Sequence, residues 1–274
     1  MTSQAGSSRP ARRRAARTRR EPRAPAGPEG PRAPAGEVVA VVSGGGSGIG
    51  REIALELARR GYALALLGRR REPLLETLAA AGAGAGGDRR GGLALVCDVR
   101  EPAAVERAAA AVERRWGAAD IVVPAAGVVR IRPFVETSPE EFIATVATNL
   151  TGTFLLARAL LPEMKRRGRG WIFAILSVAA RRVFPGWSAY CASKWGLDGM
   201  VAALREELAG SGVRVTALFP GATDTPLWEG QPGRWDRAAM VRPAAVARAV
   251  GWALDSDPGA LVEEIHLRPA GGAL

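Results

Sequence analysis

Short apolar runs alternate with longer mixed segments along most of this chain. The apolar runs span 38–42, 63–67, 93–97, 121–123, 171–176, 213–219 and 263–267. Continuous runs of this length, rich in Val, Ile, Leu and Ala, are typical of strands buried on both faces of a parallel sheet. The segments between them predict helices over 48–60, 72–80, 102–115, 139–166, 188–209 and 243–254.

Local signals support two of the helix starts. Pro102 stands at a first-turn position, and Ser138 with Glu141 three residues later has the pattern of a capping box. Regular alternation of strands and helices predicts an α/β fold, a three-layer doubly wound parallel sheet of the Rossmann-like kind with about seven strands. In such a sheet the ligand binds at the carboxyl ends of the strands.

The folded part and the N-terminal segment differ in composition. With 274 residues, 47% of them hydrophobic, the chain suits one α/β domain, which we place at 37–274. Residues 1–36 hold nine arginines and two glutamates, so they carry +7 of the net charge of +11. Because they contain almost no large apolar side chains, we predict a disordered Arg/Pro/Ala-rich extension.

The extension leaves some alternatives open. One alternative is weak binding of polyanions such as nucleic acid, which only the composition supports. Another is organelle targeting, which the many prolines and the absence of an amphipathic helical period disfavour. No run reaches the ~18 apolar residues of a membrane span. We therefore expect a cytoplasmic protein without a membrane or nucleic-acid partner. The chain has two cysteines, Cys97 and Cys191, and one histidine, His266. These numbers exclude a disulfide framework and argue against a metal site.

A glycine-rich turn joins the first predicted strand to the first helix. It reads Ser43-Gly44-Gly45-Gly46-Ser47-Gly48-Ile49-Gly50. Gly44 permits a tight turn, Gly48 lets backbone N–H groups approach a pyrophosphate, and Gly50 allows close helix–strand packing. The position of this turn predicts a dinucleotide site.

The residues after the second predicted strand indicate which dinucleotide binds. The strand ends at Leu67-Gly68 and is followed by Arg69-Arg70-Arg71, with no acid to bind a ribose 2′-hydroxyl. An arginine suits a 2′-phosphate. We favour NADP(H) over NAD(H), with Arg69 as the first candidate for the phosphate clamp and Arg70 as the second. The alternative is that these arginines are simply solvated.

A serine, a tyrosine and a lysine form the candidate catalytic group. Ser177 follows an apolar run, Tyr190 comes thirteen residues later, and Lys194 lies four residues beyond it. On a helix, Tyr190 and Lys194 share one face. We expect the Lys194 ammonium to lower the pKa of Tyr190 towards the range of an acid/base catalyst. A Tyr–Lys pair at this spacing also occurs by chance on ordinary helices.

These segments together resemble the short-chain dehydrogenases/reductases, over about 37–274. The resemblance rests on Ser43-Gly44-x-x-x-Gly48-Ile49-Gly50, Asp98-Val99, Asn149 in Asn149-Leu150-Thr151-Gly152, Ser177, Tyr190-x-x-x-Lys194, and Pro220-Gly221-Ala222-Thr223-Asp224-Thr225. One departure is Pro124-Ala125-Ala126-Gly127, where the family has Asn-Asn-Ala-Gly. Ser43 replaces the usual threonine and keeps its hydroxyl.

The resemblance implies roles for these residues. Tyr190 is the general acid, Ser177 polarises the carbonyl, Lys194 binds the nicotinamide ribose, and Asn149 holds a water that relays protons. Cofactor contacts are implied for Ser43, Gly44, Ser47, Gly48, Ile49, Gly50, Arg69, Asp98, Val99, Ala126, Gly127, Tyr190, Lys194, Pro220, Gly221, Thr223 and Thr225. The family also implies a homodimer or homotetramer. A cofactor-binding regulator without catalysis is the alternative function, because the two family asparagines are missing.

The residues in the loops beyond the strand ends indicate the class of substrate. Candidate segments are 128–134, 178–187 and the substrate loop 222–240, where Trp228 and Trp235 suggest an aromatic lid. These residues favour a hydrophobic carbonyl or secondary alcohol. Four arginines, Arg130, Arg132, Arg181 and Arg182, leave open an anionic handle on the substrate.

Overall fold

The structure, a computed structural model, describes residues 1–2, 38–82 and 92–272. The predicted extension 1–36 lies outside these ranges apart from its first two residues, as does most of the Gly/Ala-rich segment 81–92. The described chain forms a seven-stranded parallel sheet of order β3-β2-β1-β4-β5-β6-β7. Its strands are β1 Val39–Ser43, β2 Ala63–Gly68, β3 Leu93–Val96, β4 Ile121–Pro124, β5 Gly170–Ile175, β6 Val213–Pro220 and β7 Glu264–Leu267. The predicted α/β sheet is confirmed.

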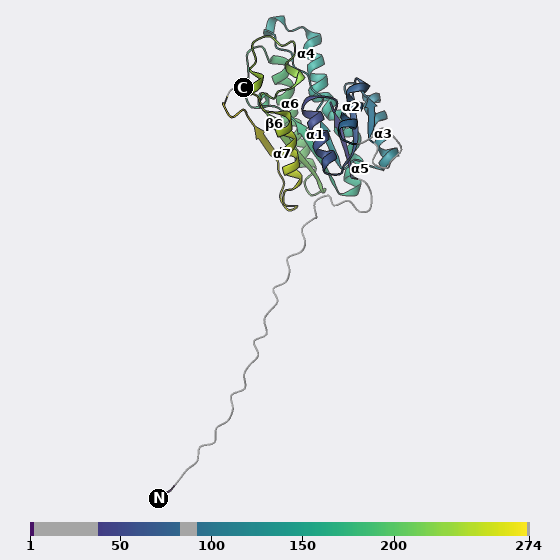
Figure 1. The fold of residues 1–274 in the computed structure, drawn as a ribbon, viewed down its shortest axis with the longest axis vertical. Helices are drawn as coiled ribbons and strands as arrows, with labels where there is room; N and C mark the ends of the chain where they lie inside the picture. Colours follow the sequence, from purple (N-terminus) through teal and green to yellow (C-terminus); the bar gives the residue numbers. More distant parts are fainter. Residues whose placement is uncertain (3–37, 83–91, 273–274) are drawn as a thin grey trace.

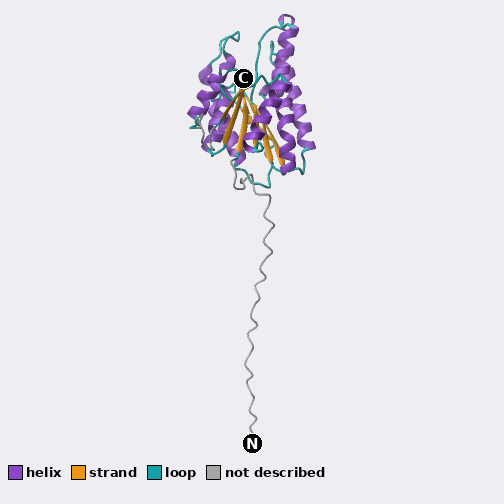
Figure 2. Cartoon of the chain, turned by 90° about the vertical axis from the view of Figure 1, so that its right-hand side faces the viewer, coloured by secondary structure: helices purple, strands orange, loops and turns teal. Residues whose placement is uncertain are grey.

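Helices cover both faces of this sheet, as Figure 2 shows. They are α1 Gly48–Arg59, α2 Arg71–Ala80, α3 Pro102–Trp116, α4 Pro139–Val146, α5 Gly152–Arg167, α6 Ser188–Glu207 and α7 Pro243–Leu254. Alternation along β1 explains the layers, since Val39 and Val41 enter a core with α3, α5 and α6. Ala40 and Val42 enter the opposite core with α1, α2 and α7. The apolar run of β1 is therefore buried on both faces, whereas the edge strands β3 and β7 stay partly exposed.

The strand order places a ligand site between β1 and β4. The chain runs outward from β1 through β2 to β3, then returns to the other side of β1 and continues from β4 to β7. Helices on the two sides diverge at this reversal, which opens a crevice above the carboxyl ends of β1 and β4. Figure 1 shows α1 and α6 near the centre of the folded part.

The long helix predicted over 139–166 contains a π-helical turn that the sequence pattern missed. Helix α4 begins after Ser138, whose Oγ accepts a hydrogen bond from the Glu141 backbone N–H at 3.2 Å, so the predicted cap is confirmed. The π turn occupies Ala147–Thr151 and includes the buried Asn149. A π turn holds one extra residue, and such turns are frequent at functional sites. The prediction of an uninterrupted helix was therefore wrong at Asn149.

Residues Pro139–Arg167 would also suit a membrane span by length and composition. Their most apolar stretch has a mean hydropathy of 1.3, and 39% of it is buried in the fold. Leu156, Leu160 and Met164 on α5 belong to the core beneath the sheet. Packing of these three side chains against the sheet explains why they are apolar.

Two helix glycines give a matched test of the close packing at the start of α1. A Cβ on Gly50 would lie 2.5 Å from the Gly44 carbonyl oxygen, whereas one on Gly199 in α6 would meet nothing within 4 Å. Gly50→Ala should lower the free energy of unfolding by about 1–3 kcal/mol, because backbone must move. Gly199→Ala should raise it by about 0.5–1 kcal/mol through helix propensity. Urea denaturation of both variants would contradict this packing if they shifted in the same direction.

Candidate active site

A cavity of about 390 Å³ opens at the carboxyl ends of the central strands. It contains most of the predicted site residues: Gly44, Ser47, Gly48, Ile49, Gly50, Arg69, Asp98, Val99, Ala126, Gly127, Ser177, Tyr190, Lys194, Pro220, Gly221, Thr223 and Thr225 line its wall. Ser43 and Asn149, the two remaining predicted residues, are not part of this lining. One cavity thus joins the glycine-rich turn to the Ser–Tyr–Lys group.

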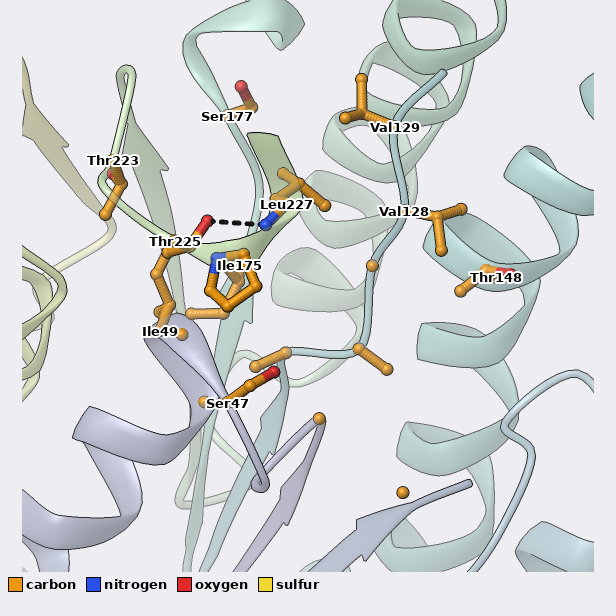
Figure 3. Close-up of a pocket in the computed structure, with 18 of the residues that line it drawn as sticks. Ser47, Ile49, Val128, Val129, Thr148, Ile175, Ser177, Thr223, Thr225 and Leu227 are labelled. Atoms are coloured by element: carbon orange, nitrogen blue, oxygen red, sulfur yellow. Dashed lines mark hydrogen bonds between the residues drawn. The ribbon is translucent and has the colours of Figure 1, made fainter. Parts of the chain in front are cut away.

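The glycine-rich turn brings bare backbone to the cavity. Gly44 has φ +67°, and a Cβ there would lie 3.0 Å from the backbone of Ala125 and Ala126. Gly48 has φ +54°, and its Cβ would stand 3.2 Å from the Thr225 side chain. Figure 3 shows Ser47 beside this turn and Thr225 facing it from the loop after β6. A side chain at Gly44 or Gly48 would press against these neighbours, so the turn can keep its path beside the α1 N-terminus only with glycine at both positions.

Ser43 and Asn149 hold the loop that follows β4. The Ser43 Oγ accepts a hydrogen bond from the Ala126 backbone N–H at 3.2 Å. Asn149 binds both backbone groups of Val128, accepting from its N–H at 2.8 Å and donating to its carbonyl at 2.9 Å. The same amide donates to the Ser193 Oγ at 3.0 Å. These bonds secure the segment in which the two family asparagines are missing.

Ser177, Tyr190 and Lys194 converge although they come from two elements. Ser177 follows β5, while Tyr190 and Lys194 lie one turn apart on α6. The Lys194 Nζ donates to the Ile175 carbonyl at 2.8 Å and stands 5.7 Å from the centre of the Tyr190 ring. The Ser177 hydroxyl is within hydrogen-bond reach of the Tyr190 phenol. The spacing in the sequence therefore does bring the three groups together.

Burial controls the pKa values of this pair. Loss of solvent raises the pKa of Tyr190 to about 12, while the hydrogen bond from Ser177 opposes that rise. Loss of solvent also lowers the pKa of Lys194 to about 8. The expectation that Lys194 would lower the pKa of Tyr190 is thus wrong for this structure. The reason is that both groups are buried and the ammonium is bound to a backbone carbonyl.

Aromatic side chains form the wall beside Tyr190. The Trp187 ring meets the Tyr190 ring edge-on at 5.6 Å, Phe184 lies 5.1 Å from Trp187, and Trp228 lies 6.0 Å from it. Trp235 in turn packs 4.5 Å from Trp228. The Trp228 Nε1 donates to the Thr223 carbonyl at 2.8 Å, which fixes the ring in the wall. Of the two tryptophans of the predicted aromatic lid, Trp228 lines the cavity, and Trp235 packs against it without lining the cavity.

Gln231 fastens the lid to the opposite loop. Its Oε1 accepts from the Ile131 backbone N–H at 3.2 Å, and its Nε2 donates to the Val129 carbonyl at 3.3 Å. The Arg132 backbone N–H also donates to the Gly186 carbonyl at 2.9 Å. These bonds join the three predicted substrate loops around the mouth. Nothing in the sequence singles out Gln231, because its partners are about a hundred residues away.

Some residues that line the cavity carry no clear signal in the sequence, and some predicted residues do not line it. Arg100 and Thr148 line the cavity although the sequence did not predict them, whereas Val128 and Val129 belong to the predicted segment 128–134. The only signal for Arg100 and Thr148 was a position just beyond a strand end or beside Asn149. Of the four substrate-loop arginines, none lines the cavity. Arg132 pairs with Glu141, and Arg181 pairs with Asp198 and Glu264.

The buried lysine predicts a specific dependence of stability on pH. Its pKa falls from 10.5 in the unfolded chain to about 8 in the fold, so between these values the unfolded chain binds more protons. The contribution of Lys194 to the free energy of unfolding should therefore rise with pH across this window. Tyr190, whose pKa is raised from 10.0 to about 12, has the opposite effect above pH 10. Cys97, whose pKa burial raises from 9.0 to about 11, has the opposite effect above pH 9, so the test compares variants at the same pH.

Urea denaturation at pH 8 and pH 10 would measure this term. Wild type should gain stability relative to Lys194→Met, whereas the exposed-site variant Lys165→Met should follow wild type. If the free energy of unfolding changed equally between pH 8 and pH 10 for wild type and Lys194→Met, a pKa of Lys194 lowered by burial would be contradicted.

Comparison with known proteins gives consistent matches across sequence and structure. A family model for short chain dehydrogenase matches residues 38–233. The chain is 36% identical over 242 residues to a sepiapterin reductase of Chlorobaculum tepidum, covering 85% of this chain and 97% of that protein. It is 40% identical over 199 residues to a D-threitol dehydrogenase of Mycolicibacterium smegmatis, covering 71% of this chain and 75% of that protein.

A solved structure has the same fold at similar identity. The alcohol dehydrogenase of the archaeon Thermococcus sibiricus, complexed with 5-hydroxy-NADP, matches with a TM-score of 0.76 and 32% identity. The match covers 85% of this chain and 97% of that chain.

Proposed function

The chain belongs to the short-chain dehydrogenase family and is an oxidoreductase of CH–OH and C=O groups, and we propose that it uses NADP(H) on a neutral, hydrophobic carbonyl or secondary alcohol. The resemblance inferred from the sequence is confirmed. The observation that carries the proposal is the single cavity that joins the glycine-rich turn to Ser177, Tyr190 and Lys194.

The residues present fit a nicotinamide dinucleotide. Gly44 and Gly48 keep the turn free of Cβ atoms, and the α1 N-terminus meets the same space. Arg69 and Arg70 line the cavity after β2, where no acid stands to bind a ribose 2′-hydroxyl. The archaeal relative binds an NADP derivative. These features support NADP(H) over NAD(H).

Tyr190 moves the proton in the proposed reaction. The bound nicotinamide supplies or accepts the hydride. In the reductive direction Tyr190, fully protonated at neutral pH because burial raises its pKa, donates its phenolic proton to the carbonyl oxygen. Ser177 hydrogen-bonds the same oxygen and orients it, and Lys194 provides positive charge one helical turn away. We assign Asn149 to holding the Val128 loop and, with Ser193, the base of this group.

The distribution of charge supports a neutral substrate. The side of the cavity beyond Tyr190 is lined by Val128, Val129, Val178, Phe184, Trp187, Leu227 and Trp228. The charged lining residues are Lys194 beside Tyr190 and, after β2 and β3, Arg69, Arg70, Asp98 and Arg100. An anionic handle would find no arginine on the apolar side among the described residues. An apolar wall with two convergent hydroxyls suits a hydrophobic carbonyl.

Loss of catalysis, the alternative raised by the sequence, is not supported. The segment that lacks the family asparagines is held by Ser43 and Asn149. Ser177 and Lys194 both remain close to Tyr190. A regulator that had lost catalysis would be under no constraint to keep this arrangement.

Turnover and its dependence on Tyr190 test the proposal. Purified protein with NADPH and a panel of neutral aromatic and aliphatic ketones should consume reduced nicotinamide, followed by its absorbance. Tyr190→Phe should lower kcat by about 10²-fold or more because no proton donor remains. NADPH binding, measured by fluorescence, should be kept. Tyr62→Phe, at the other tyrosine of the chain, is the control. Full turnover by Tyr190→Phe would sink the proposed mechanism.

We also propose a homo-oligomer, as the family resemblance implies. Phe142 and Ile143 on α4, Phe154 on α5 and Trp195 on α6 expose between 39% and 64% of their surface. Large apolar side chains gathered on neighbouring helices are typical of subunit interfaces. Analytical ultracentrifugation should find a dimer or tetramer that Phe154→Arg shifts towards monomer, whereas Val183→Arg, at a residue on the mouth loop, should not. A monomeric wild type would contradict the proposal.

A further inference from the structure

Three arginines and one aspartate line the cavity after β2 and β3. They are Arg69, Arg70, Asp98 and Arg100, called here the arginine rim. The register pairs Gly68 with Val96, and the Cys97 backbone N–H donates to the Gly68 carbonyl at 2.9 Å. The residues that follow β2 and β3 therefore stand side by side. The rim carries a formal charge of +2, the complement of a phosphate dianion.

Asp98 holds the Arg100 guanidinium in one orientation. The Arg100 Nε donates to Oδ1 at 3.0 Å, Nη2 donates to Oδ2 at 2.6 Å, and the Arg100 backbone N–H donates to Oδ1 at 3.0 Å. Arg100, and more weakly Arg69, hold the pKa of Asp98 below its usual range. Arg69 is thus close enough to Asp98 to act on its charge. The pair places Arg100 next to the predicted phosphate clamp.

The Asp98–Arg100 ion pair contributes little to the stability of the fold. The two side chains are 38% and 24% exposed, and pairs in such positions contribute about 0–1 kcal/mol to folding. A guanidinium has five N–H donors in a rigid fork. The contacts with Asp98 use Nε and one side of Nη2. Among the described residues Nη1 has no hydrogen-bond partner, so it can donate to a second acceptor.

We propose that Arg100, positioned by Asp98, is a second phosphate-binding arginine that recognises the 2′-phosphate of NADP(H) together with Arg69. The inference rests on the proposed cofactor. Asp98 acts here as a positioning residue, because its carboxylate oxygens are engaged by Arg100. This differs from the contact with adenine that the family resemblance implied for Asp98.

Nucleotide fragments test the inference without catalysis. Isothermal titration calorimetry with 2′,5′-ADP and 5′-AMP gives the dissociation constant of each fragment. The dissociation constant of 5′-AMP divided by that of 2′,5′-ADP measures the contribution of the 2′-phosphate to binding. Arg100→Gln should lower this ratio by about tenfold or more, as expected for a lost charge-assisted hydrogen bond. Arg69→Gln should do the same. Arg71→Gln, on the neighbouring arginine that does not line the cavity, should leave the ratio unchanged.

Asp98→Ala separates positioning from simple charge. Removing a carboxylate from a phosphate site should on electrostatic grounds raise the ratio, whereas loss of the orientation of Arg100 should lower it. We expect the ratio to fall. A rise in Asp98→Ala, or an unchanged ratio in Arg100→Gln while Arg69→Gln loses selectivity, would overturn the inference and leave the proposed cofactor intact. A wild type that binds both fragments equally would instead overturn the NADP(H) preference, and this inference with it.

Discussion

A buried ammonium group must keep a hydrogen-bond partner, and much of this site follows from how Lys194 meets that requirement. An unpaired charge in a protein interior costs several kcal/mol. The Lys194 Nζ is bound by the carbonyl of Ile175, the last residue of β5. This bond fixes α6 against the end of β5. Tyr190, one turn earlier, is thereby brought to Ser177, two residues past the strand.

Much of this architecture could be predicted from the sequence, because its cause is local. Runs such as Val39–Val42 are apolar on both faces, and only a strand between two helical layers can bury them. The Tyr190–Lys194 spacing likewise puts both groups on one helix face. What escaped prediction depends on the folded environment. The pKa of Tyr190 rises through burial, and the π turn at Asn149 leaves no mark in an apolar pattern.

The segment after β4 shows how lost side-chain bonds are replaced. Pro124 cannot donate a backbone hydrogen bond, yet it ends a strand in the middle of the sheet. It is tolerated because pairing between β4 and β5 stops at Val122, while pairing with β1 continues to Ser43. The Ser43 hydroxyl and the Asn149 amide then hold the loop at Ala126 and Val128, just after the positions of the missing asparagines. A small hydroxyl at the end of β1 is thus part of the solution.

The single amide of Gln231 has a consequence for how the three loops support one another. It binds the segment 129–131 from the lid, and the same segment is bound through Arg132 to the loop that carries Trp187. Each loop is therefore shaped by residues that belong to the other two. A lid without Gln231 would lack this anchor and leave Val129 and Ile131 without these partners. Loss of an anchor in one of the three loops therefore also changes the support of the others.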